Sequence, residues 1–165
     1  MRLPSRAVWA AMGVVSLASV AMAVFSQHRW EMQPCPWCIL QRLIFIGIGV
    51  LSLMAACLPP RGNTLTRLAG RLLAVLVTLL AASGAAAALY QNQVAAKSDS
   101  CDMTLADRII SGIGVDARWP DMFEVRASCA DAAVSLMGVP YELWSLLLFV
   151  LMGALAVHRL FARDR

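Results

Sequence analysis

Residues 35–58 read CPWCILQRLIFIGIGVLSLMAACL, a CxxC pair followed directly by the apolar run 39–58. A hydrocarbon layer of about 30 Å takes roughly 20 helical residues to cross. Three further runs of similar length lie at 7–25, 72–90 and 140–160. Inside lipid each run must satisfy its own backbone, and membrane strands would be about half as long, so we expect helices. The fold class predicted is all-α, a four-helix transmembrane bundle.

The composition of the chain agrees with a membrane setting. Hydrophobic residues make up 60% of the chain and charged residues only 15%, whereas soluble proteins average about 25% charged residues. At 165 residues the chain is predicted to form one integral membrane domain, 1–165, with outer loops at 26–38 and 91–139. Small residues follow one another at 81–88 and favour close helix packing.

The first apolar run has a second interpretation as a secretion signal. Arg2 and Arg6 precede it, and Ala21-Met22-Ala23 resembles a cleavage site. The uncharged stretch 7–26 is longer than the roughly 7 to 15 residues of a signal core, so an uncleaved helix is preferred.

The arginines predict the orientation of the bundle. They gather at both ends of the chain and in the link between the second and third runs, at Arg2, Arg6, Arg61, Arg67, Arg71, Arg159, Arg163 and Arg165. These segments are therefore expected in the cytoplasm. The net charge of +4 then reflects membrane topology, and no basic patch indicates nucleic-acid binding.

With this orientation Cys35, Cys38, Cys101 and Cys129 all lie outside the cytoplasm, in a compartment that permits disulfides. Cys57 differs, because it follows Cys38 by about 19 residues on the same helix and lies roughly 28 Å deeper. We interpret Cys57 as a buried free thiol that takes no part in the chemistry of the other four.

Three interpretations of the four outer cysteines compete: two structural disulfides, a zinc site, or two redox pairs that exchange. Zinc sites generally need a second closely spaced Cys or His pair, which the long loop lacks, so no metal is predicted. The redox interpretation gains from Arg42, which stands four residues after Cys38 and shares its helical face. The helix N-terminus and the guanidinium both favour the thiolate form of Cys38. A charge inside an apolar segment is also a candidate functional group, although snorkelling of Arg42 to headgroups is the plainer alternative.

Over nearly its whole length the chain resembles the DsbB family, the quinone-coupled membrane proteins that reoxidise the periplasmic thiol oxidase DsbA. The resemblance rests on the four-helix pattern, the CxxC pair, Arg42, and the cysteine pair between the third and fourth runs. The related vitamin K epoxide reductase group places its loop cysteines before the CxxC pair, and here the order is reversed.

The resemblance implies a role for each cysteine. Cys101 and Cys129 would form a loop disulfide, with Cys101 as the residue that joins the DsbA-like partner in a mixed disulfide. Released Cys129 would attack Cys35, and Cys38 would pass electrons to a quinone near Arg42. The implied location is a bacterial inner membrane with the redox loops in the periplasm. The implied cofactor is ubiquinone or menaquinone. The non-enzymatic alternative is a four-helix membrane protein with two inert disulfides.

Three further features of the sequence concern the long loop and the helix ends next to it. Thr104 and Asp107 resemble a capping pair before an apolar stripe, which predicts a short interfacial helix in the long loop. Glu142 follows Pro140 and fits an ordinary helix start, so it is given no catalytic role. The only polar candidates for quinone contact at the end of the third run are Tyr90, Gln91 and Asn92.

Overall fold

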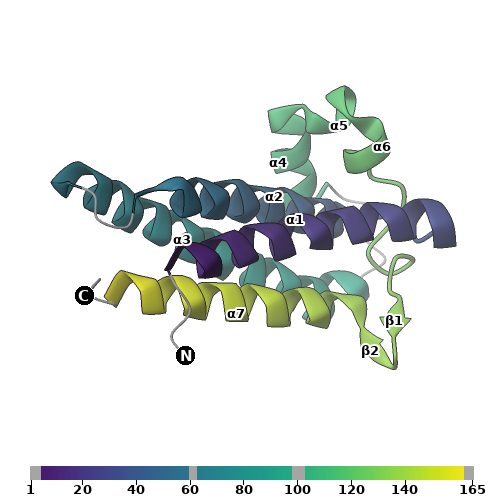
Figure 1. Cartoon of the computed structure of the whole chain (residues 1–165). Helices are drawn as coiled ribbons and strands as arrows, with labels where there is room; N and C mark the ends of the chain where they lie inside the picture. Colours follow the sequence, from purple (N-terminus) through teal and green to yellow (C-terminus); the bar gives the residue numbers. More distant parts are fainter. Residues whose placement is uncertain (1–4, 60–62, 98–102, 162–165) are drawn as a thin grey trace.

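Each of the four apolar runs forms a long helix, and the helices pack as an antiparallel bundle (Figure 1). The computed structural model describes residues 5–59, 63–97 and 103–161. The four helices are α1 (Ser5–Trp30), α2 (Pro36–Cys57), α3 (Thr64–Gln93) and α7 (Tyr141–Phe161). All four are long and apolar enough to cross a membrane, which confirms the predicted all-α class.

Two of these helices extend well beyond the apolar runs that predict them. α1 continues through Gln27 and His28, and α3 begins eight residues before position 72. At the start of α3 the Asn63 side chain accepts a hydrogen bond from the Thr66 N–H at 3.0 Å. Such N-caps satisfy a backbone donor outside the apolar layer, so a helix can begin in water before it enters lipid.

The centre of the bundle is closely packed around aromatic rings. Phe149 of α7 is fully buried and stacks on Phe45 of α2, with ring centroids 4.1 Å apart. Gly84 of α3 lies beneath the Phe149 ring, where an added Cβ would meet ring carbons at 2.5 Å. The third helix therefore needs a residue without a side chain at this position.

We expect Gly84→Ala to lower the free energy of unfolding by about 1–3 kcal/mol, because the new methyl group displaces the Phe149 ring in a filled core. Gly112→Ala is the matched control, since an added Cβ there meets nothing within 4 Å. Thermal unfolding of both variants in detergent micelles tests the prediction. Equal midpoints for Gly84→Ala and wild type would show that the core can absorb the methyl group.

The long loop between α3 and α7 contains several short elements. They are η1 (Ala95–Lys97), α4 (Leu105–Ile113), α5 (Val115–Arg118), α6 (Pro120–Phe123), β1 (Ser135–Leu136) and β2 (Val139–Pro140). α4 is the short helix predicted from Thr104 and Asp107, whose side chains form a reciprocal capping box. It ends at Gly114, which adopts a left-handed conformation with φ of 72°. The strands pair antiparallel, with Ser135 opposite Pro140.

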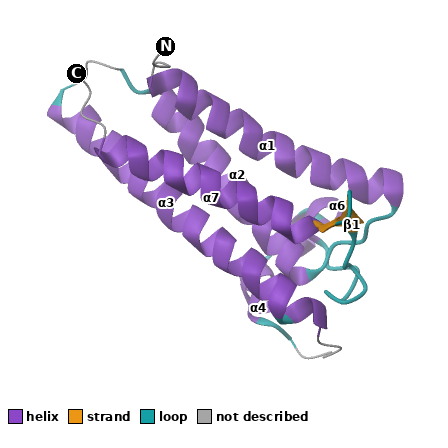
Figure 2. Ribbon diagram, turned by 90° about the horizontal axis from the view of Figure 1, so that it is seen from below, coloured by secondary structure: helices purple, strands orange, loops and turns teal. Residues whose placement is uncertain are grey.

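The segment α4–α6 is attached to the bundle by its own small core. Ile110, Val115 and Phe123 are buried against Ile39, the residue that directly follows the CxxC pair. Figures 1 and 2 show that the short loop elements lie at one end of the bundle. The start of α1, the end of α2, the start of α3 and the end of α7 lie at the other end.

Candidate active site

The CxxC pair lies at the first turn of α2. Cys35 is the N-cap residue, Pro36 occupies the first turn, and the Cys38 N–H donates to Cys35 Sγ at 3.3 Å. Proline suits this place because its missing N–H would have no partner there. The turn brings the Cys35 and Cys38 sulfur atoms to within 2.9 Å of each other, both as free thiols.

Cys129 meets this pair from the long loop. It is buried in one cluster with Cys35 and Trp37, and the loop is tied nearby by the Arg126 N–H, which donates to the Pro34 carbonyl at 3.1 Å. A hydrogen bond from Cys35 lowers the pKa of the Cys129 thiol, and the backbone N–H of Trp37 adds to the effect. The same contact raises the pKa of Cys35. Cys129 is therefore the more nucleophilic thiol of the two.

Arg42 lies inside the protein and does not snorkel. Its side chain is only 6% exposed. The Nη1 atom donates to Gln27 Oε1 at 2.8 Å and to the Met122 carbonyl at 2.9 Å, and Nη2 donates to the Ala23 carbonyl at 3.4 Å. A buried guanidinium held by three acceptors from α1 and α6 keeps a fixed position.

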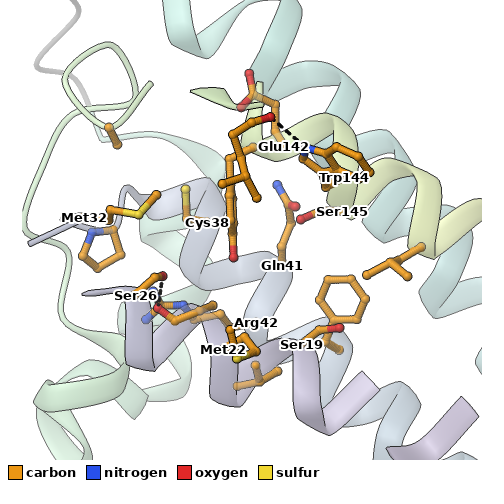
Figure 3. Close-up of a pocket in the computed structure, with 18 of the residues that line it drawn as sticks. Ser19, Met22, Ser26, Met32, Cys38, Gln41, Arg42, Glu142, Trp144 and Ser145 are labelled. Atoms are coloured by element: carbon orange, nitrogen blue, oxygen red, sulfur yellow. Dashed lines mark hydrogen bonds between the residues drawn. The ribbon is translucent and has the colours of Figure 1, made fainter. Parts of the chain in front are cut away.

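Cys38 and Arg42 both line a cavity of about 460 Å³. Its wall combines α1, the start of α2, the end of α3, the hairpin and the first turns of α7, and most of it is apolar (Figure 3). In Figure 3 Arg42 and Glu142 lie on opposite sides, with Cys38 and Gln41 between them. α1 and α7 make few contacts with each other, so the cavity lies where the bundle is least tightly closed.

Two amide side chains complete the polar part of the cavity wall. Gln41 of α2 donates from Nε2 to Gln91 Oε1 at 2.7 Å, and Gln91 Nε2 donates to Cys38 Sγ at 3.3 Å. Gln91 was among the polar candidates in the sequence, but Gln41 was not. The available signal was an amide placed inside an apolar segment, next to Arg42, where an unpaired polar group is costly.

Glu142 lies in the first turn of α7, as the sequence predicts for a helix start, and its side chain is buried. Its side chain is 5% exposed, lines the cavity, and accepts a hydrogen bond from Asn92 Nδ2 at 2.9 Å. This contact links the first turn of α7 to the end of α3. Two polar pairs, Gln41–Gln91 and Asn92–Glu142, thus join three helices around the cavity.

The remaining two cysteines lie away from these contacts or outside the described residues. Cys101 falls in the segment 98–102, which is not described, so its predicted role stays a prediction. Cys57 is the last residue of α2, at the far end of the bundle. The expectation that it is buried is wrong, because its side chain is exposed at the protein surface. The helix ends there, so no neighbouring helix covers it.

Comparison with known proteins agrees with this geometry. A family model described as "Disulfide bond formation protein DsbB" matches residues 5–158. A protein named "Disulfide bond formation protein B" from Ralstonia nicotianae is 32% identical over 168 residues, covering 100% of this chain and 99% of that relative. One of the same name from Dechloromonas aromatica is 33% identical, covering 99% of this chain and 97% of the relative. This chain therefore belongs to the DsbB family of disulfide bond formation proteins.

Proposed function

We propose that this protein is a membrane thiol oxidase, which reoxidises a DsbA-type periplasmic protein and passes the electrons to membrane quinone. The observation that carries the proposal is the sequence of contacts from Cys129 to Cys35 to Cys38. The last of these sulfurs borders an apolar cavity beside a buried arginine. A protein with two inert structural disulfides would not require a third sulfur atom in contact with the CxxC pair.

These contacts support the proposed order of thiol exchange for Cys129, Cys35 and Cys38, and the family resemblance supplies the role of Cys101. A thiolate of the reduced partner attacks Cys101, the Cys101–Cys129 bond breaks, and a mixed disulfide forms. The released Cys129 thiolate attacks Cys35, so the Cys35–Cys38 bond breaks and Cys38 leaves as a thiolate. The second thiol of the partner then attacks the mixed disulfide, which frees Cys101 and leaves the partner oxidised. Cys101 next attacks Cys129 in the newly formed Cys35–Cys129 bond, which restores the Cys101–Cys129 disulfide and releases Cys35, so that Cys35 and Cys38 are both reduced. Each step needs a thiolate and an accessible sulfur, and the lowered pKa of Cys129 supplies the second nucleophile.

The cavity fits a quinone headgroup in size and chemistry. Small-molecule sites generally have volumes of about 300–1,000 Å³, apolar walls and a few convergent polar groups. Here the polar groups are Arg42, Gln41 and Gln91, and side chains of α1 and α7 also line the cavity. A bound quinone supplies an acceptor for two electrons and two protons as the Cys35–Cys38 disulfide forms again. Arg42 and the Gln91 amide stabilise the Cys38 thiolate that faces this acceptor.

The same proposal places the protein in a bacterial inner membrane. Arg6, Arg67 and Arg159 lie at the end of the bundle where α1 begins and α7 ends, and the described cysteines of the relay lie at the other end. Basic residues favour the cytoplasmic side. The termini are thus cytoplasmic and the redox loops periplasmic, where DsbA-type proteins act.

The test is a reconstituted reaction of the purified protein with a reduced DsbA-type protein and a short-chain quinone, followed by quinone absorbance. Wild type should reduce one quinone per partner dithiol oxidised. A partner variant that keeps only its attacking cysteine should break the Cys101–Cys129 bond of the wild type and accumulate as a covalent complex through Cys101, visible without reductant on a gel. Cys101→Ser should form no such complex. Cys57→Ser is the control and should behave as wild type. No quinone reduction by wild type, or no complex with the single-cysteine partner, would contradict the proposal.

A further inference from the structure

The short helix α6 ends with backbone carbonyls that accept no hydrogen bond from a backbone N–H among the described residues. The last turn of any helix lacks further N–H donors for its carbonyl groups. The Glu124 N–H donates a hydrogen bond to the Pro120 carbonyl, and the Arg126 N–H donates to the Pro34 carbonyl. The carbonyls of Asp121 and Met122 are left for other partners.

Two side chains from the membrane helices donate hydrogen bonds to these carbonyls. Gln27 of α1 donates from Nε2 to the Asp121 carbonyl at 3.2 Å, and Arg42 of α2 donates to the Met122 carbonyl at 2.9 Å. The Gln27 Oε1 atom also accepts from Arg42 Nη1 at 2.8 Å. Gln27 is 3% exposed and has both ends of its amide engaged. The three groups form a closed set of hydrogen bonds between α1, α2 and α6.

Gln27 acts on the cavity only through its neighbour. The residues that line the cavity include Ser26 and Arg42 but not Gln27. Gln27 and Met122 together occupy Nη1 of Arg42, which leaves Nε without an acceptor among the described residues. The orientation of the guanidinium plane at the cavity therefore depends on the contact with Gln27.

We propose that Gln27 is a positioning residue that orients Arg42 at the cavity and ties α6 to the bundle. α6 lies between Cys101 and Cys129 in the sequence, so this contact joins the quinone side of the site to the loop that carries both cysteines. Its effect on turnover rests on the proposed quinone chemistry, whereas its effect on α6 does not.

The experiment compares Gln27→Met, which keeps the size of the side chain and removes both hydrogen bonds, with Gln93→Met at the exposed end of α3. Trypsin cleavage after Arg118 and Arg126, which flank α6, reports on the attachment of α6 in the purified full chain without quinone. We expect cleavage of Gln27→Met to be about fivefold faster, the effect of losing about 1 kcal/mol of hydrogen bonding. The KM for a short-chain quinone should rise about tenfold with kcat within about twofold, because Arg42 loses its orientation before quinone binds. Gln93→Met should match wild type in both assays.

A second variant separates the two contacts. Gln27→Glu keeps an oxygen acceptor for Arg42 but loses the donor to Asp121, so cleavage should be faster while KM changes less than in Gln27→Met. Unchanged cleavage of Gln27→Met would overturn the proposal. Faster cleavage with an unchanged KM would also overturn it, because Gln27 would then be a structural contact only. If wild type fails to reduce quinone, the proposed function fails, and the cleavage comparison still decides whether Gln27 holds α6.

Discussion

Replacing Cys38 by serine is expected to stop catalytic quinone reduction, with a fall in turnover of at least about a thousandfold, as for the loss of a reacting nucleophile in other enzymes. Among the described cysteines of the proposed relay, Cys38 is the one that lines the cavity. Its sulfur contacts both Cys35 and Gln91. A serine hydroxyl keeps these polar contacts but cannot form a disulfide. In the proposed relay, the variant can still form the loop disulfide Cys101–Cys129.

The amount of partner dithiol oxidised per chain distinguishes a single turnover from continued turnover. Cys38→Ser mixed with excess reduced partner should oxidise at most about one partner dithiol per chain and then stop, since no electrons leave the protein. Cys57→Ser, which alters a thiol at the other end of α2, should sustain full turnover. Continued quinone reduction by Cys38→Ser would show that another group delivers the electrons.

Replacing Arg42 by methionine is expected to raise the KM for quinone about a hundredfold, which corresponds to about 2.7 kcal/mol of lost binding. The change removes the cation beside the Cys38 thiolate. It also leaves Gln27 Oε1 and the Met122 carbonyl without their donor inside the protein. Arg42→Lys should recover only part of the loss, because one ammonium group does not reproduce the planar guanidinium fork that reaches acceptors on both α1 and α6.

Initial rates over a range of quinone concentrations test this prediction. Arg67→Met is the control for the loss of a positive charge, since Arg67 is exposed at the opposite end of the bundle. Its KM should equal that of wild type. A KM for Arg42→Met within about twofold of wild type would remove Arg42 from the quinone site and leave it a structural role alone.

The membrane helices could be predicted from the sequence because lipid imposes a local rule. Each apolar run must pair its own backbone groups, so the length and composition of the run are enough to identify a helix. Helix α4 was also predictable, since Thr104 and Asp107 lie within one turn and cap it without help from distant residues.

The other short elements could not be predicted in this way. α5 and α6 each contain four residues, too few to be stable alone. Phe123 is buried against Ile39, and Asp121 is bonded by Gln27, so both contacts come from helices far away in the sequence. The outward extension of α1 likewise depends on packing, because Gln27 is buried there by the loop.

By itself the sequence determined the four membrane helices, the CxxC pair at a helix start and the presence of Arg42 one turn later, because these are relations between near neighbours. Only the tertiary structure decided that Cys129 meets Cys35, that Gln91 reaches Cys38, and that Arg42 is buried between Gln27 and α6. These contacts join residues 15 to 94 positions apart. Their formation depends on how the helices and the long loop pack together, which no single segment specifies.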